Sequence, residues 1–285
     1  MAVAERHDGV VINADSAQVY RDLRVLTARP SPEDEARVPH QLFGHVDGAE
    51  SYSAARWAEE ARAEIEAAGA TGKLPVLVGG TGMYLRTLLD GIAPVPEIDP
   101  AIRAEVRALP VAEAHAALAL RDATAAARLA PADTTRVARA LEVVRSTGRT
   151  LGEWQTAKTG GIGDRISLAA VILLPDREWL MQRCDARAAM MFADGARDEV
   201  RALLTRTDIA ASAPIRRAIG VAEMAALLSG ETTEAQALAR TRTATRQYAK
   251  RQYTWFSNQP PANWRRTTAI ENTTLEEELD ILLRA

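Results

Sequence analysis

The stretch Val10–Tyr20, with the sequence VVINADSAQVY, constrains the fold of this chain more than any other. Its β-branched run, Val10–Ile12, predicts a buried strand of a parallel sheet. A polar turn, Asn13–Gln18, follows at the carboxyl end of that strand, where open α/β sheets bind their ligands. Asp15 and Ser16 are therefore candidate site residues, with the carboxylate of Asp15 as the candidate general base. Capping of the following turn is the alternative role for an aspartate in this place.

A second unit of the same kind lies further along the chain. Pro75–Val78 predicts another buried strand, and the glycine turn Gly79–Gly82 opens a helix expected over Met83–Leu89. Backbone N–H groups at such a helix start can bind an anion or orient a ligand. We therefore expect Thr81, which lies in this turn, to face the same crevice as Asp15. A tight turn alone also explains the glycines, so that alternative stays open.

The pattern of helices around these strands predicts an α/β fold with an insertion. Ser53–Ala68, capped by its first residue, lies between the two strands and gives a βαβ unit, hence a parallel sheet. Leu168–Leu174 predicts a third strand of that sheet, and alanine-rich helical segments separate it from the second. We expect a core formed by residues 1–96 and 164–285, with helices in its C-terminal part, and a helical insertion over residues 97–163.

The composition and the apolar runs argue for a globular protein of a reducing compartment. Hydrophobic residues make up 47% of the chain and charged residues 26%, which is ordinary for a soluble domain. The longest apolar run, Leu168–Leu174, is too short to span a bilayer, and charged residues interrupt the N-terminus before any signal region forms. One cysteine, Cys184, permits no internal disulfide. We expect a cytoplasmic monomer without membrane contact.

Basic residues gather in one part of a chain whose net charge is −3. Residues 235–270 contain no acidic residue, whereas Arg242, Arg246 and Lys250 recur at helical spacing within them. Solvated helix faces usually mix both signs of charge, so this stripe indicates an electropositive surface that suits a nucleic-acid partner.

The expected insertion carries a second basic pair. Arg136 and Arg139 fall on one helix face, at the start of a helix that Asp133 caps. Contact with nucleic acid and ion pairing with Asp133 or Glu142 are both open for these side chains.

Four segments of the chain resemble one protein family. They are NADSAQVYRDLRVLTARP (Asn13–Pro30), LPVLVGGTGMYLRTLLDG (Leu74–Gly91), DTTRVARALEV (Asp133–Val143) and ATRQYAKRQYTWF (Ala244–Phe256). In this order and spacing they are similar to the tRNA dimethylallyltransferases, also called tRNA isopentenyltransferases. The resemblance implies a P-loop-kinase-like α/β core with a parallel sheet, a helical insertion domain and a helical C-terminal part.

The resemblance also implies an activity and a set of site residues. A dimethylallyl group moves from dimethylallyl diphosphate, with Mg²⁺, to N6 of the adenosine at position 37 of tRNA, 3′ to the anticodon. Matched by motif, Asp15 is the general base and Thr81 hydrogen-bonds at the same centre, while Ser16, Ala17 and Gln18 line the adenine site. The residues expected to contact the tRNA anticodon stem-loop from the insertion are Arg103, Thr135, Arg136, Val137, Ala138 and Arg139.

The sequence departs from the family pattern near its start. The family carries a G-x-x-x-x-G-K-[ST] loop, which follows its first strand and holds a diphosphate, and we find no match to it before Asn13. Gly72-Lys73 is rejected as a counterpart because it precedes a strand. We therefore expect the first strand, an interior one, and this Walker A loop to be missing, through a start codon assigned too far downstream. Arg177, after the third strand, is expected to help hold the diphosphate.

Two other functions stay open at this point. An adenylate isopentenyltransferase would prenylate a free nucleotide and would not need the arginines of the insertion or of the C-terminal stripe. An inactive tRNA-binding remnant would explain the missing loop.

Overall fold

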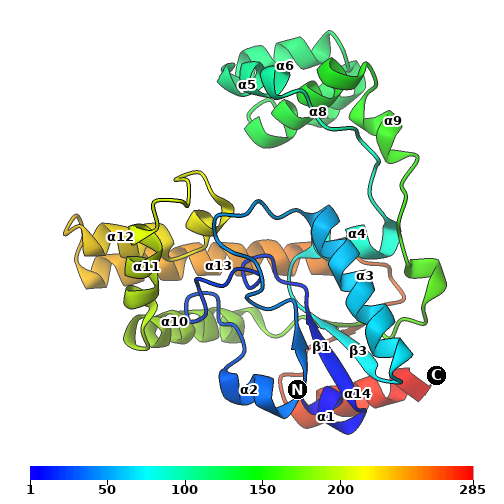
Figure 1. Cartoon of the computed structure of the whole chain (residues 1–285), viewed down its shortest axis with the longest axis vertical. Coiled ribbons are helices and arrows are strands. Elements are labelled where there is room, and N and C mark those ends of the chain that lie inside the picture. Colours follow the sequence, from blue (N-terminus) through cyan, green and yellow to red (C-terminus); the bar gives the residue numbers. More distant parts are fainter. Residues whose placement is uncertain (285) are drawn as a thin grey trace. The chain divides into compact units, whose positions relative to one another are not determined.

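The computed structural model describes residues 1–284, and all of their side chains except those of residues 272, 273 and 284. The chain divides into two compact units, one formed by Met1–Leu88 with Arg165–Ala285 and the other by Leu89–Asp164. In Figure 1 the second unit carries the labels α5, α6, α8 and α9.

The strand β1 (Gly9–Asn13) is the centre of a parallel sheet. It pairs with β2 (His40–Gln41) on one side and with β3 (Leu74–Val78) on the other, which gives the order β2-β1-β3. All five residues of β1 are buried, as its β-branched sequence predicts. The helix α3 (Ala54–Ala70) connects β2 to β3 and packs on both β1 and β3 (Figure 1). The predicted parallel sheet and βαβ unit are confirmed.

The prediction that the second strand is buried was wrong. β3 is half-buried along most of its length, and Val78 at its end is 50% exposed. The reason is its place in the sheet, because β3 is an edge strand with β1 as its neighbour. Pro75 suits such a strand, since proline donates no ladder hydrogen bond.

The third strand was also predicted too long and in the wrong sheet. β4 (Val171–Leu173) pairs in parallel with β5 (Arg265–Thr267), and these two strands form a sheet of their own within residues 1–284. Leu168–Ala170 is irregular, although it belongs to the same run of apolar residues as β4. A strand extends only as far as its partner offers N–H and C=O groups, and β5 offers three residues. β5 gives no apolar pattern that would have predicted it.

Helices complete the core unit. The predicted capping box of Thr233 and Gln236 is present at the start of the long helix α13 (Glu234–Asn258), which packs along α10 (Arg177–Ala193). The other helices of this unit are α1 (Ala2–Arg6), α2 (Pro32–Arg37), α4 (Gly82–Asp90, whose last two residues belong to the insertion unit), α11 (Ala196–Thr205), α12 (Val221–Leu228) and α14 (Asn272–Arg284), with the short 3-10 helices η1 (Gly163–Arg165, whose first two residues belong to the insertion unit) and η2 (Pro214–Arg217).

The insertion unit is helical, as predicted, and has its own apolar core. Buried side chains from its helices, among them Leu118, Val137 and Leu141, form one cluster. Its helices are α5 (Pro100–Ala108), α6 (Val111–Ala119), α7 (Ala123–Arg128), α8 (Thr134–Thr147) and α9 (Leu151–Gln155). Across residues 1–284, no helix combines the length and the apolar character that a membrane span requires.

Candidate active site

The polar turn after β1 is held by the last residue of that strand. Asn13 is fully buried, its Oδ1 accepts the backbone N–H of Asp15 at 2.8 Å, and its Nδ2 donates to the carbonyl of Leu42 at 3.0 Å. The indole N–H of Trp57 in α3 donates to the Asn13 carbonyl at 2.7 Å. A buried amide with all these partners fixes the direction in which the chain leaves the strand, and with it the place of Asp15.

The turns after β1 and β3 meet, as the sequence predicts. Ala14 N–H donates to the Val78 carbonyl at 2.8 Å, and Thr81 N–H donates to the Ala14 carbonyl at 3.1 Å. The Thr81 hydroxyl oxygen accepts the Ser16 N–H at 3.0 Å and lies 3.2 Å from the Ser16 hydroxyl. Gly79 makes this approach possible, because a Cβ there would lie 2.2 Å from the Ala14 carbonyl carbon.

The Asp15 carboxyl group lies in a partly dry environment. Its Oδ1 accepts the Ala17 N–H at 2.8 Å. Burial raises the pKa of Asp15 above its ordinary value, while hydrogen bonds from the Ala17 and Gln18 backbone and the positive charge of Arg187 act in the opposite direction. A carboxylate with a raised pKa is a stronger base than an exposed one, which suits proton abstraction.

Asp15 lines a cavity of about 560 Å³ within the core unit. Gln18 lines it and forms part of its support, since Nε2 donates to the carbonyls of Thr27 at 3.0 Å and Ala28 at 2.9 Å. The other lining residues come from the ends of β1 and β3, the turn before α2, α10 and α13, and include Arg29, Pro30, Val78, Gly79, Gly80, Arg187, Thr245, Tyr248, Ala249 and Gln252.

Three lining residues were given no site role from the sequence, although Tyr248 and Gln252 lie in the matched segment Ala244–Phe256. Arg187 in α10 is a cation beside Asp15, and Gln252 in α13 donates from Nε2 to the Gly80 carbonyl at 3.0 Å. Burial, followed by the negative charge of Asp15, raises the pKa of Tyr248. All three lie in the interior of long helices, where sequence spacing alone does not show which side chain faces a cavity in another part of the chain.

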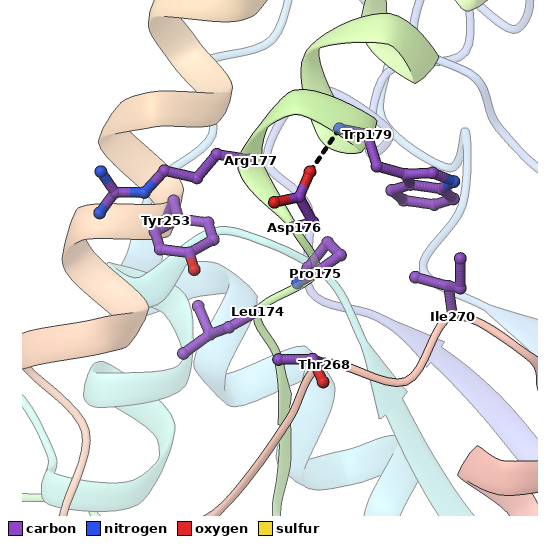
Figure 2. A pocket seen from close by; sticks show the side chains of 8 residues that line it. All are labelled: Leu174, Pro175, Asp176, Arg177, Trp179, Tyr253, Thr268 and Ile270. Carbon is purple, nitrogen blue, oxygen red and sulfur yellow. Dashed lines mark hydrogen bonds between the residues drawn. The ribbon is translucent and has the colours of Figure 1, made fainter.

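Arg177 lies in a different cavity. This second cavity, of about 620 Å³, is drawn in Figure 2 and shares no lining residue with that of Asp15. The Arg177 guanidinium lies over the Tyr253 ring at 4.9 Å, and Asp176 caps α10 by accepting the Trp179 N–H at 2.9 Å. The structure therefore does not bring Arg177 to Asp15, and Arg187 is the arginine whose charge acts on Asp15.

The insertion unit presents arginines around one buried carboxylate. Glu142 is 1% exposed and pairs with Arg107 at 2.8 Å. Burial lowers the pKa of Arg139; Glu142 opposes this, whereas the neighbouring charges of Arg103 and Arg107 add to it. One carboxylate against these three guanidinium groups leaves an excess of positive charge on this face. Arg107 is the member that the sequence did not single out.

The other residues expected to contact tRNA from the insertion differ in exposure. Thr135 and Arg136 are exposed, and Arg136 pairs with Asp133 at 3.5 Å. Ala138 is partly buried, and the Val137 side chain is fully buried in the core of this unit.

The basic stripe of α13 is partly engaged inside the protein. Arg246 pairs with Asp185 of α10 at 2.9 Å, and Arg242 Nε donates to the Asp185 carbonyl at 3.3 Å. Lys250 is exposed. Part of the stripe thus joins α13 to α10, a role that charge spacing alone did not predict.

Comparisons with known proteins agree with this architecture. Residues 18–259 match the family model described as IPP transferase. A tRNA dimethylallyltransferase of Sphingopyxis alaskensis is 60% identical over 277 residues, which cover 97% of this chain and 90% of that protein. Another, from Novosphingobium aromaticivorans, is 58% identical and covers 91% of this chain and 92% of that protein.

Solved structures show the same fold. The full-length tRNA isopentenylpyrophosphate transferase of Bacillus halodurans matches 99% of this chain and 92% of its own, with 30% identity and a TM-score of 0.68. A eukaryotic dimethylallyltransferase, captured acting on tRNA, matches 89% of this chain and 64% of its own, with 28% identity and a TM-score of 0.76. The expected α/β fold is thus confirmed. Because the family model matches residues 18–259, which are most of this chain, the chain belongs to the IPP transferase family.

Proposed function

We propose that this protein transfers a dimethylallyl group from dimethylallyl diphosphate to N6 of the adenosine at position 37 of tRNA, 3′ to the anticodon. The observation that carries the proposal is the position of the Asp15 carboxylate, which lies beside Arg187 where the turns after β1 and β3 meet. Burial raises the pKa of this carboxyl group. Membership of the IPP transferase family and relatives named tRNA dimethylallyltransferase support it.

Asp15 supplies the base that this reaction needs. An exocyclic amine of adenine is a poor nucleophile because its lone pair is delocalised into the ring. As its nitrogen forms the bond to the allylic carbon and the carbon–oxygen bond to diphosphate breaks, the amine proton passes to the Asp15 carboxylate. The hydroxyl groups of Thr81 and Ser16, 3.2 Å apart, provide hydrogen-bonding partners beside it.

Departure of diphosphate requires positive charge near the same centre. Arg187, a lining residue of the Asp15 cavity, can stabilise the negative charge that grows on the leaving oxygen. Mg²⁺ prefers oxygen ligands, several of which substrate phosphates commonly supply. The hydroxyl oxygens of Ser16 and Thr81 would be its protein neighbours, which leaves the Asp15 carboxylate free to accept the amine proton, and the ion would supply charge neutralisation of the diphosphate.

The tRNA substrate requires contacts beyond the cavity. A base stacked in an anticodon loop must be extruded before a buried carboxylate can reach it. Each of the two units has positive residues that can bind phosphates: Arg103, Arg107 and Arg139 on the insertion unit, and Lys250 on the core unit.

We further propose that the protein acts as a monomer in the cytoplasm.

Labelled dimethylallyl diphosphate separates this function from its alternatives. With Mg²⁺, we expect label to appear in unmodified tRNA and not in AMP. Transfer to AMP instead would indicate an adenylate isopentenyltransferase. Binding of tRNA without any transfer would indicate an inactive remnant. Fully modified tRNA serves as the control acceptor, because its N6 is already occupied.

Arg103 tests the contact between the insertion and tRNA phosphates. The Arg103→Ala variant should weaken tRNA binding and reduce the slope of log K against log[salt] by up to about one unit, the loss of one phosphate contact. The Arg103→Lys variant, which keeps the charge, is the matched control and should retain the slope. A slope that is the same in all three proteins would show that Arg103 does not contact phosphate.

A further inference from the structure

A compact turn, residues 24–29, continues into the wall of the Asp15 cavity. Ala28 N–H donates to the Val25 carbonyl and Arg29 N–H to the Arg24 carbonyl, each at 3.0 Å. Thr27, Ala28, Arg29 and Pro30 line the cavity. The shape of this turn therefore sets one side of the space in which substrate would lie.

One carboxylate from a helix far along the chain holds the start of this turn. Glu199 Oε1 accepts the N–H groups of Arg24 at 2.8 Å and Val25 at 2.7 Å, and Oε2 accepts that of Leu26 at 3.0 Å. Successive backbone N–H groups that point to one side make an anion-binding concavity, and here a side chain of the protein fills it. Hydrogen bonds to an ionised acceptor are about twice as strong as neutral ones.

The helix that carries Glu199 is firmly anchored. Ala196, Val200 and Leu203 of α11 are buried, and Glu199 lies on the same face of the helix at spacings of three and four residues. Just after α11, Arg206 pairs with Asp22 at 3.0 Å, which ties down the chain before the turn as well. The turn is thus held by Glu199 of α11, and the chain just before it by Arg206, which follows α11.

The turn at residues 24–29 holds Gln18, a predicted site residue. The carbonyls of Thr27 and Ala28 accept the Gln18 side-chain amide, and the Gln18 backbone N–H donates to the Asp15 carbonyl at 3.2 Å. A continuous path of hydrogen bonds therefore leads from Glu199 to the turn, then to Gln18 and to Asp15. Glu199 itself does not line the cavity.

We propose that Glu199 is a positioning residue for prenyl transfer: it holds the turn at residues 24–29 and, through Gln18, the geometry around Asp15. The kinetic part of this inference rests on the proposed function. A loosened wall misplaces the reacting groups, and small misplacements lower the rate of the chemical step. Contacts that bind the body of tRNA lie elsewhere, so kcat should change more than KM.

Hydrogen exchange of the intact 285-residue chain tests the clamp without reference to activity. In Glu199→Ala, amides 24–26 should exchange about tenfold faster or more, and amides 16–18 should follow, because local protection reports local opening. Glu199→Gln should lie between this variant and the wild type, since its amide oxygen still accepts two of the N–H groups while its NH₂ group faces the third. Asp198→Asn, the neighbouring charge on α11, should leave both segments unchanged.

Steady-state kinetics then test the positioning role. We expect kcat to fall about tenfold in Glu199→Ala with KM for tRNA within about twofold of the wild type. Unchanged exchange at residues 24–26 would overturn the clamp. Faster exchange there with normal exchange at residues 16–18, or with normal kcat, would overturn the positioning role. A wild type that transfers no prenyl group would contradict the proposed function alone, because the exchange at residues 16–18 would still decide this inference.

Discussion

Replacement of Asp15 with asparagine is expected to reduce prenyl transfer by about 10²- to 10⁴-fold, the usual contribution of a general base. The change is nearly isosteric, and Asn Oδ1 can still accept the Ala17 N–H that Asp15 Oδ1 accepts at 2.8 Å. The turn should therefore keep its shape, and tRNA binding should stay within about twofold of the wild type because phosphate contacts dominate such affinity. Asp8→Asn, at an exposed carboxylate paired with Lys73, is the matched control and should keep full activity.

The same substitution has a predictable effect on stability. Burial raises the folded-state pKa of Asp15, so ionisation of this group at neutral pH opposes folding. Asp15→Asn should therefore be at least as stable as the wild type at pH 7. This difference should vanish as the pH falls from the raised pKa to below about 3.9, where the carboxyl group is protonated in both the folded and the unfolded state.

The pH–rate profile follows from the same shift. The wild type needs an ionised Asp15, so its activity should fall with acid at a pH above the ordinary aspartate value of about 3.9. Turnover that is unchanged in Asp15→Asn would remove Asp15 as the base.

Replacement of Gly79 with alanine is expected to have the second large effect. Its Cβ would lie 2.2 Å from the carbonyl carbon and 2.3 Å from the carbonyl oxygen of Ala14. Both are backbone atoms of the turn after β1, so neither can move aside as a flexible side chain would. Separation of the two turns should cost about 3 kcal/mol of unfolding free energy. It should also break the bonds between Thr81 and Ser16 and lower transfer by about 10²-fold.

Gly69 provides the matched control for this glycine. It is the second-last residue of α3, and a Cβ added there would meet nothing within 4 Å. Gly69→Ala should therefore keep its activity and gain about 0.5–1 kcal/mol, since alanine is a better helix residue. Denaturant unfolding together with the labelling assay measures both quantities. A Gly79→Ala protein as stable and as active as Gly69→Ala would contradict the close packing of the two turns.

Local signals made much of this fold predictable. The β-branched run of β1, the cap at Ser53 and the capping box at Thr233 each act within a few residues, and the structure confirms all three. Pairing in the second sheet was not predictable in this way. β4 and β5 are separated by about ninety residues, and neither the extent of one nor the existence of the other follows from local pattern.

The candidate site likewise has features that the local sequence predicts and features that only packing decides. Ser16 and Thr81 stand in turns that follow two neighbouring strands, and parallel strands bring such turns to one edge, so their contact was predictable from order along the chain. Arg187, Tyr248 and Gln252 reach the cavity from helices whose rotation about their axes is set by packing. Charge spacing on α13 likewise did not show that Arg246 is used to bind Asp185.

The sequence by itself determined the strand, the two turns and the chemistry of the carboxylate, because each depends on residues that are neighbours in the chain. Only the tertiary structure decided which cation stands beside Asp15, which strands pair, and that Glu199 holds a turn about 175 residues before it. These features depend on contacts between distant segments, whose partners are chosen by packing of the whole core and leave no local pattern.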